Sequence, residues 1–411
     1  MNTTIETNRP RIVATGPHLG RDWRLLWTAS AISTLGDGAF LAVLPLLALT
    51  MTTDPRLIAG VTAWGTLPWL LASLPAGAVV DRCDARRSMV LVQGVQALLV
   101  ALLAAVTMLN AGHIALLYAV AFTLGVAETV AKIAAQKLIP AVVPAELLEQ
   151  ANGRQNASLF TAKEFLGPPL GTLLFWLAAP LPLWADVATF AVSAVLIARI
   201  AARTWQAAPA TRRSLRAEIG EGLRWLAGHR LLRTLSLLSG VANLANYMAM
   251  ATLVLFARQR LGLTEVGYGL LVGVMAVGGI AGSLLSRRIV ARFGGRAVVT
   301  ATLFTTPLAM LGIGLLARDP LTLGLLATVS SFGASLWNVA SGSLRQRTVP
   351  GDLLGRVSSA GLLLAWGVQP LGAVLGGLIA GSFGLAAPWL CAGALRLLAA
   401  ACALPTLREW R

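Results

Sequence analysis

The strongest constraint on this chain is a series of long apolar segments that continues along almost its whole length. The 411 residues are 56% hydrophobic and only 12% charged, whereas globular domains carry about 25% charged residues. About 20 apolar residues are enough for a helix to cross the hydrocarbon core of a bilayer. The composition and spacing therefore predict an all-α polytopic membrane protein with twelve transmembrane helices. The segments are 25–50, 57–80, 88–109, 114–136, 156–178 and 181–200, followed by 235–257, 266–286, 297–317, 321–344, 357–382 and 385–404.

The basic residues indicate the orientation of these segments. Alternate loops, starting with the amino terminus, hold nearly all of the arginine, and the loops on the other side hold only Arg56, Arg258, Arg260 and Arg318. Cytoplasmic loops of membrane proteins carry such an excess of basic residues, so we expect both termini in the cytoplasm. The net charge of +16 does not indicate a nucleic-acid partner, because the arginines do not gather on one polar domain.

The two halves of the chain share short motifs. The run AGAVVDR at 76–82 matches AGSLLSR at 281–287, and VPAELL at 143–148 matches VPGDLL at 349–354. Both pairs fall in equivalent loops, as internal duplication in transporters predicts. Between the halves, 211–233 has apolar residues at helical spacing among arginines, which predicts an amphipathic helix on the inner leaflet. We expect a cytoplasmic tail at 1–22, six-helix bundles at 23–202 and 234–405, a cytoplasmic linker at 203–233 and a tail at 406–411.

One loop resembles the signature of a known family. The run GAVVDRCDARR at 77–87 is similar to the signature between the second and third helices of the major facilitator superfamily, and the resemblance covers the chain from about 21 to 404. It implies that fold, and a cytoplasmic gate in which a carboxylate pairs with arginine in one conformation and releases it in another. The alternative is a positively charged loop that only anchors the chain. The gate residues it implies are Gly77, Asp81, Arg82, Arg86 and Arg87.

Three shorter motifs resemble one branch of that superfamily. They are LGDG at 35–38, ADVATF at 185–190 and EGLRWL at 221–226. The branch contains the Tap-type drug efflux pumps, the macrolide efflux proteins and the enterobactin exporter. The resemblance implies export of a small amphipathic drug or secondary metabolite, usually by proton antiport. A siderophore or other specific metabolite exporter and a proton-coupled uptake symporter are the alternatives, because the sequence fixes neither substrate nor direction.

Asp37 is the first candidate for proton coupling. It lies about twelve residues, or roughly 18 Å, from the cytoplasmic start of its helix and so near the middle of the bilayer. A carboxylate at that depth is costly unless it is paired, hydrated or protonated, and is therefore a functional candidate. The flanking Gly36 and Gly38 permit close helix approach. The alternative is that Asp37 only forms a hydrogen bond with a neighbouring helix.

Four more charged residues lie in the fourth and fifth apolar segments at comparable depth. Glu128 and Lys132 are one helical turn apart and are expected to pair. Lys163 and Glu164 are adjacent, so one of them is expected to face the fourth helix. Glu128 and Glu164 are candidates for proton coupling and Lys132 for the substrate cavity. A neutral, structural charge cluster is the alternative.

Aromatic and amide side chains inside the spans are candidates for the wall of a substrate cavity. Aromatic faces bind cations and bulky apolar groups, and a few amides fix a ligand's orientation. The alternative for each of them is ordinary packing. They are Trp69, Asn243, Asn246, Tyr247, Trp337, Asn338, Trp366 and Gln369.

The fifth apolar segment carries a glycine and proline motif. Proline lacks an amide donor and kinks a helix, and the run GPPLG at 167–171 resembles a motif found in many antiporters of the same superfamily. As a bare pattern it is weak, since glycine and proline are common in membrane helices. The predicted kink residues are Gly167, Pro168, Pro169 and Gly171.

No enzyme site is recognisable in the sequence. It contains neither a His-Glu-x-x-His motif nor a phosphate-binding loop, and the three cysteines are not spaced for a metal site. Asp186 lies near the outer end of its segment, so it does not match Asp37 in depth as an aspartyl protease would need. We expect no catalytic residue, no metal and no cofactor.

The expected partners follow from this class. They are the lipid bilayer, a small-molecule substrate and protons, with no nucleic acid. A bundle that encloses its own path needs no second copy, so a monomer is expected, in the bacterial cytoplasmic membrane.

Overall fold

The computed structural model describes residues 19–72, 83–201, 215–350 and 353–408, together with Ala76 and Val80. Within these residues every regular element is a helix, and no strand occurs. Ten helical stretches are long and apolar enough to cross a membrane. The predicted all-α polytopic class is therefore confirmed.

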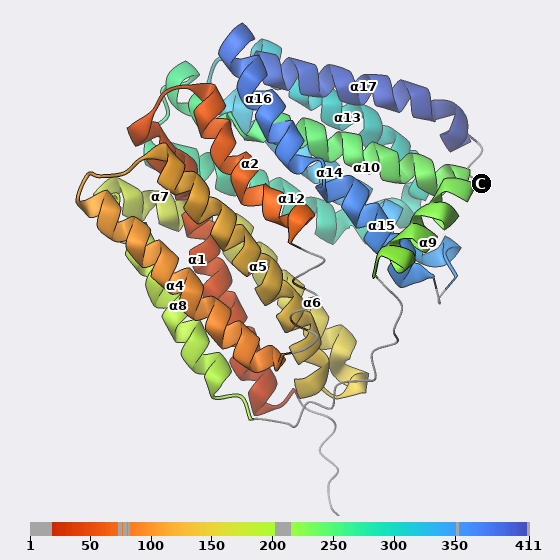
Figure 1. Ribbon diagram of the computed structural model, residues 1–411. Coiled ribbons are helices and arrows are strands. Elements are labelled where there is room, and N and C mark those ends of the chain that lie inside the picture. The colour runs from red at the N-terminus through yellow and green to blue at the C-terminus, as the bar shows by residue number, and fades with distance from the viewer. Residues whose placement is uncertain are drawn as a thin grey trace, which may run out of the picture.

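The first half of the chain forms one group of helices, drawn in red to green-yellow in Figure 1. The central α1 contacts α7 and α8, while α4 packs between α5 and α8. These helices are α1 (Arg21–Met51), α2 (Pro55–Leu71), α4 (Ala85–Met108), α5 (Ile114–Val142), α6 (Leu148–Leu159), the π-helix η2 (Phe160–Leu166), α7 (Gly167–Leu177) and α8 (Leu181–Ala198), with a short 3-10 turn η1 (Ala145–Leu147).

The second half forms a corresponding group, drawn in green to blue. Its α14 packs against α12 and α13, and α17 packs against α13 and α10. The helices are α10 (Arg230–Met250), α11 (Leu253–Leu255), the π-helix η3 (Phe256–Arg260), α12 (Glu265–Phe293), α13 (Gly295–Leu316), α14 (Pro320–Thr348), α15 (Leu354–Trp366), α16 (Gln369–Phe383) and α17 (Ala387–Arg408).

Two of the twelve predicted segments are not among these ten stretches. The segment 57–80 begins as α2, but most positions after Ala72 lie outside the described residues. The segment 156–178 is divided among α6, η2 and α7. The number of twelve spans and the cytoplasmic position of the termini therefore remain predictions.

Close packing joins α1 to the broken fifth segment. A Cβ atom at Gly38 would overlap the backbone of Lys163, and a Cβ atom at Gly171 would overlap the backbone of Ala39. Helices whose contact positions lack side chains approach until their backbones touch, which is a common way for membrane helices to associate. The contact fixes the depth at which η2 presents its charged side chains.

The expected linker contains the helix α9 (Leu215–Gly228). Its position on the inner leaflet remains a prediction. The helix packs against α15, with Leu226 buried and an ion pair of 3.0 Å between Glu221 and Arg356. The apolar stripe that sequence periodicity assigns to a bilayer is therefore used in part to cover the second half of the protein.

The two halves meet mainly through α2 with α16 and α7 with α12. Glycines form much of this seam: Gly377 faces Ala59, Gly381 faces Arg56 and Gly269 faces Thr172. The seam lies toward the end of the molecule that carries the connections 52–54, 178–180 and 384–386. In Figure 1 the two groups diverge from there toward α6 and α9.

Candidate functional site

A cavity of about 850 Å³ lies between the two halves. Drug-sized ligands occupy pockets of roughly 300–1,000 Å³, so the space suits a small molecule. All nine predicted cavity residues line it, which places them on one surface although they come from both halves. They are Trp69, Lys132, Asn243, Asn246, Tyr247, Trp337, Asn338, Trp366 and Gln369. Their roles in substrate binding remain predictions.

The predicted coupling residues Asp37, Glu128 and Glu164 line the same cavity. Glu128 of α5 forms an ion pair of 2.7 Å with Lys163 of η2, so Lys163 is the residue of the adjacent pair that faces α5. The expected pairing of Glu128 with Lys132 is not the one that forms. Because α5 contacts both η2 and α2, side chains one turn apart on it reach different neighbours.

Lys132 instead lies over two aromatic rings. Its Nζ is 4.5 Å from the ring centroid of Trp69 and 4.6 Å from that of Trp366. The negative face of an indole ring attracts a cation, and more strongly when water is partly excluded. Since Trp69 belongs to the first half and Trp366 to the second, Lys132 takes part in a contact that joins the halves.

Asp186 lines the cavity and lies near the beginning of α8, as the sequence indicates. The expected difference in depth between Asp186 and Asp37 is wrong. Asp186 is 1% exposed, and a Cβ atom at Gly36 would overlap both Asp186 and Thr189, so its carboxyl group lies against α1 next to Gly36 and therefore beside Asp37. The depths match because α1 continues to Met51, well past the level at which α8 begins.

The hydrogen bonding of Asp186 is incomplete. The hydroxyl of Thr189 donates to Oδ1 over 3.1 Å, while Oδ2 is buried and has no hydrogen-bond partner in the described part of the chain. An unpartnered buried carboxylate oxygen is costly, and binding a proton or a cation would relieve that cost.

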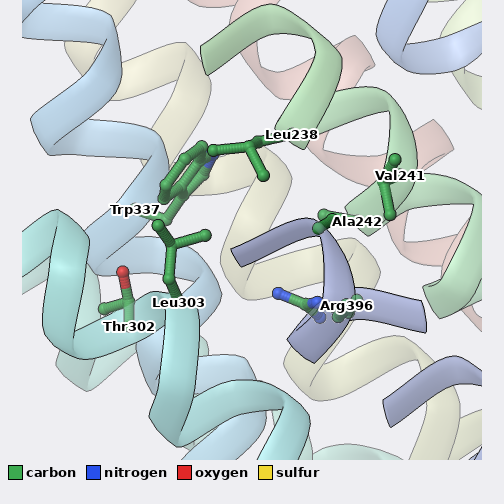
Figure 2. Close-up of a pocket in the computed structure, with 8 residues that line it drawn as sticks. Leu238, Val241, Ala242, Thr302, Leu303, Trp337 and Arg396 are labelled. Carbon is green, nitrogen blue, oxygen red and sulfur yellow. The ribbon is translucent and has the colours of Figure 1, made fainter. Parts of the chain in front are cut away.

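Arg396 of α17 is a second cavity residue that the sequence analysis missed. It lines the main cavity and also an adjoining pocket of about 20 Å³ inside the second half, shown in Figure 2 with Trp337 and Thr302. A single arginine inside the apolar segment 385–404 is the signal that would have revealed it.

Amide and hydroxyl contacts continue along the wall of the second half. Gln369 Nε2 donates to Asn243 Oδ1 over 3.2 Å, and Trp337 Nε1 donates to the hydroxyl of Ser239 over 3.3 Å. Because these groups satisfy one another, they present an ordered polar surface rather than isolated buried dipoles. The wall is thus polar but carries no carboxylate.

The residues proposed as a gate are only partly described. Gly77, Asp81 and Arg82 lie outside the described residues. Arg86 donates from Nη1 to the backbone oxygen of Ile200 over 2.8 Å, at the carboxyl end of α8, where a cation is favourable. Arg87 donates its backbone amide to Asp84 over 2.9 Å at the start of α4. The gating role remains a prediction.

The glycine and proline motif lies at the junction of η2 and α7. Gly167 is the first residue of α7, Pro168 and Pro169 follow it in the first turn, and Gly171 packs against α1. The change of helix type therefore occurs immediately before the motif. A short π-helix inside a longer helix is frequently found at functional sites.

Two helical halves around a cavity lined by charged, amide, aromatic and aliphatic side chains, with apolar helices long enough to span a bilayer, define a multi-pass membrane transporter. In bacteria such a protein lies in the cytoplasmic membrane. The chain belongs to the Major Facilitator Superfamily, whose family model matches residues 26–365. Lipid and a small-molecule substrate are therefore its partners.

Two relatives carry the same name. The chain is 31% identical over 405 residues to the multidrug efflux pump Tap of Mycolicibacterium fortuitum, covering 94% of this chain and 96% of the relative. It is 28% identical over 410 residues to the multidrug efflux pump Tap of Mycobacterium tuberculosis H37Rv, covering 94% of each. The resemblance to the Tap-type branch is thereby confirmed.

Solved structures share the fold. A bacterial homologue of the iron transporter ferroportin in the inward-facing state matches with a TM-score of 0.75 and 16% identity, over 95% of this chain and 99% of that one. A bacterial homologue of the lysosomal transporter Spinster, inward-facing and unoccupied, matches with a TM-score of 0.73 and 13% identity, over 94% and 96%.

Proposed function

We propose that this protein exports a small amphipathic molecule across the cytoplasmic membrane by alternating access, in exchange for protons. The names of the Tap relatives support drug efflux. The observation that carries the proposal is the cluster of carboxyl groups that faces the cavity from the first half. We propose that the protein acts as a monomer without nucleic acid, since one chain contributes both walls.

The charges of the first half support proton coupling. Its cavity wall contains four carboxylates, Asp37, Glu128, Glu164 and Asp186, and two ammonium groups, Lys132 and Lys163, which leaves a formal charge of −2. Protons and a cationic substrate neutralise this charge equally well. If protons and the cationic substrate compete for the same carboxylates, the cavity holds either protons or substrate at one time. This mutual exclusion is the requirement for antiport.

Asp37 is the proposed main proton carrier. Glu128 is held in an ion pair with Lys163, whereas Asp37 has no ion pair in the part of the chain that the structure describes. It lies beside Asp186, whose Oδ2 lacks a hydrogen-bond partner there. Two neighbouring carboxyl groups repel each other when both are ionised, so one of them favours a proton. Binding of a cation releases that proton.

The geometry supports alternation between two states. The halves touch at the glycine seam of Gly269, Gly377 and Gly381 and diverge toward the end that carries the termini. With the orientation predicted from the arginines, this conformation faces the cytoplasm. A change in which the seam opens and the opposite end closes would present the cavity to the outside.

The test is accumulation of ethidium in efflux-deficient bacteria that express the wild-type protein, Asp37→Asn or the control Glu265→Gln, each with and without a protonophore. Glu265 pairs with Arg258 and does not line the cavity. We expect the wild type and the control to keep ethidium out until the protonophore is added, and Asp37→Asn to lose this exclusion at equal expression. Equal ethidium in wild-type and empty cells would contradict export of such cations.

A second experiment separates antiport from symport. Proteoliposomes with an acidic interior should accumulate ethidium through an antiporter, because protons leave as the dye enters. A symporter would expel dye from the same vesicles. Uptake that is unchanged when the pH gradient is removed would contradict proton coupling.

A further inference from the structure

Arg396 is a charged residue that forms no ion pair in the part of the chain that the structure describes. It lies in the membrane-spanning part of α17, where an ionised side chain is costly and is retained mainly at functional sites. The only side-chain hydrogen bond recorded for it in the described residues is from Nη1 to the sulfur of Met310 over 3.6 Å. A thioether is a weak acceptor, so this contact does not balance the charge.

Neither of the two described carboxylates of the second half pairs with Arg396. Residues 234–405 contain three acidic residues, Glu265, Asp319 and Asp352. Glu265 is paired with Arg258 at 2.6 Å, and Asp319 caps the start of α14. Asp352 lies between α14 and α15 in the sequence, outside the described residues. Within the part of the chain that the structure describes, an opposite charge for Arg396 is left to the far wall of the cavity or to a bound molecule.

Arg396 is accessible to such a molecule. It belongs both to the wall of the 850 Å³ cavity and to the small pocket behind it, which has room for about one water molecule. Figure 2 shows its side chain directed into this region below Ala242, with Trp337 on the other side. A guanidinium group presents several donors in one plane, which matches the two oxygens of a carboxylate.

The walls of the cavity therefore differ in charge. The first half has a formal charge of −2, and the second half contributes the single cation Arg396. We propose that Arg396 binds a carboxylate group of the transported molecule, so that the preferred substrates are zwitterions whose amine or iminium group faces the acidic wall. The proposal rests on the proposed function in taking this cavity as the substrate site.

The test uses two dyes that differ in one group. Rhodamine B carries a cationic xanthene and a free carboxylate, and its ethyl ester keeps the cation but lacks the anion. Binding of each dye to the purified, detergent-solubilised protein is measured by fluorescence anisotropy for the wild type, Arg396→Gln, Arg396→Lys and Arg345→Gln. Arg345 lies in α14 and lines neither cavity, so it controls for loss of one positive charge.

We expect Arg396→Gln to weaken binding of rhodamine B by about tenfold or more, because the lost contact is a charge-assisted hydrogen bond, and to change binding of the ester by less than about twofold. Arg396→Lys should restore part of the difference, and Arg345→Gln should leave both affinities unchanged. Elution as a single peak in size-exclusion chromatography shows that each variant is folded.

Three results would overturn the proposal. They are an equal loss of affinity for both dyes in Arg396→Gln, unchanged binding of rhodamine B in that variant, and failure of the wild type to bind rhodamine B. None of these decides the proposed function. Failure of proton-driven export would appear instead as ethidium accumulation in wild-type cells that does not respond to a protonophore.

Discussion

Trp69 of α2 and Trp366 of α15 meet edge to face across the boundary between the two halves, with 5.2 Å between their ring centroids. Lys132 of α5 lies over both rings. An aromatic pair of this geometry contributes about 0.5–1.5 kcal/mol beyond its buried area, and a partly desolvated cation adds a similar amount. These three side chains form an energetic link between the halves at the level of the cavity.

This link predicts coupled effects on stability. Trp366→Leu and Lys132→Met should each lower the thermal midpoint of the detergent-solubilised protein, and the double variant should lower it by less than the sum, because the second change removes a contact that is already lost. Loss of size-exclusion peak height on heating measures the midpoint. Additive shifts would show that Lys132 is not stabilised by Trp366.

The ion pair between Glu128 and Lys163 predicts that a substitution of both residues reduces the yield of folded protein less than a substitution of one of them. Removal of one partner leaves an uncompensated charge in the membrane interior, whereas removal of both does not. Glu128→Gln should therefore reduce the yield of folded protein several-fold, and Glu128→Gln with Lys163→Met should restore it. Yield is measured by fluorescence-detected size-exclusion chromatography.

The same double variant separates two roles of Glu128. If Glu128 serves mainly to hold Lys163, restored protein should retain protonophore-sensitive ethidium exclusion. Folded protein without that exclusion would indicate that Glu128 or Lys163 takes part in transport directly.

Asp186 should be required for transport and not for folding. Asp186→Asn keeps the shape of the side chain and removes the charge, so we expect normal yield and a loss of ethidium efflux of about tenfold or more, comparable to Asp37→Asn. The double variant Asp37→Asn with Asp186→Asn should lose no more efflux than either single variant, because the effects of substituting residues that act as one unit are not additive. Full efflux in Asp186→Asn would contradict its role.

The seam between the halves should respond to added side chains. Gly377 faces Ala59 and the backbone of Pro55, so Gly377→Val should push α2 from α16. Gly94 of α4 has no neighbouring atom at the position of an added Cβ, and Gly94→Val is the matched control. Spin labels at Thr53 and Ala386, with the three cysteines replaced by serine, should report a larger population of long distances in Gly377→Val alone. Identical distance distributions in both variants would contradict a steric seam.

Asp319 predicts a pH-dependent contribution to folding stability from a residue outside the membrane-spanning segments. Its carboxylate accepts hydrogen bonds from the backbone amide and the hydroxyl of Thr322 at 2.8 and 2.7 Å, and these bonds lower the pKa of Asp319. Because the pKa is lower in the folded state, the stabilisation is present above the pKa of the unfolded chain, near 4, and is lost as the pH falls through the lower folded value.

Asp319→Ala should accordingly lower the thermal midpoint at pH 7, through loss of the helix cap. The difference from the wild type should shrink when the pH is brought below about 4, where the unfolded-state carboxyl is protonated. Thermal midpoints at a series of pH values measure this. A difference that does not change with pH would show that the carboxylate form is not what caps α14.

Every residue predicted for the cavity wall lines it, because polar and aromatic residues inside apolar segments have few stable positions other than an enclosed wall. Trp69, Asn243 and Gln369 were found in this way, and the structure brings them together. The sequence does not reveal how far neighbouring helices are displaced along their axes. For that reason the position of Asp186 near the outer end of α8 predicts a depth different from that of Asp37, although Asp186 lies against the middle of α1.

Pairing rules based on spacing within one helix also failed where contacts between helices determine which side chains pair. The spacing of Glu128 and Lys132 favours a pair within one helix, but each side chain binds a residue from another element. Arg396 escapes prediction because the alternation of basic loops uses arginine only as a marker of cytoplasmic loops. An arginine in the interior of an apolar segment is instead a candidate for the cavity wall, because ionised side chains at that depth are retained mainly at functional sites.

The glycine seam at Gly269, Gly377 and Gly381 has a genetic consequence. Every single-nucleotide missense change in a glycine codon introduces a side chain. Random mutation at these sites can therefore only add atoms to the seam and push the two halves apart. Such alleles would enrich the conformation that faces the outside. Selection with a transported toxin should therefore recover second-site suppressors in which a partner such as Thr172 becomes smaller.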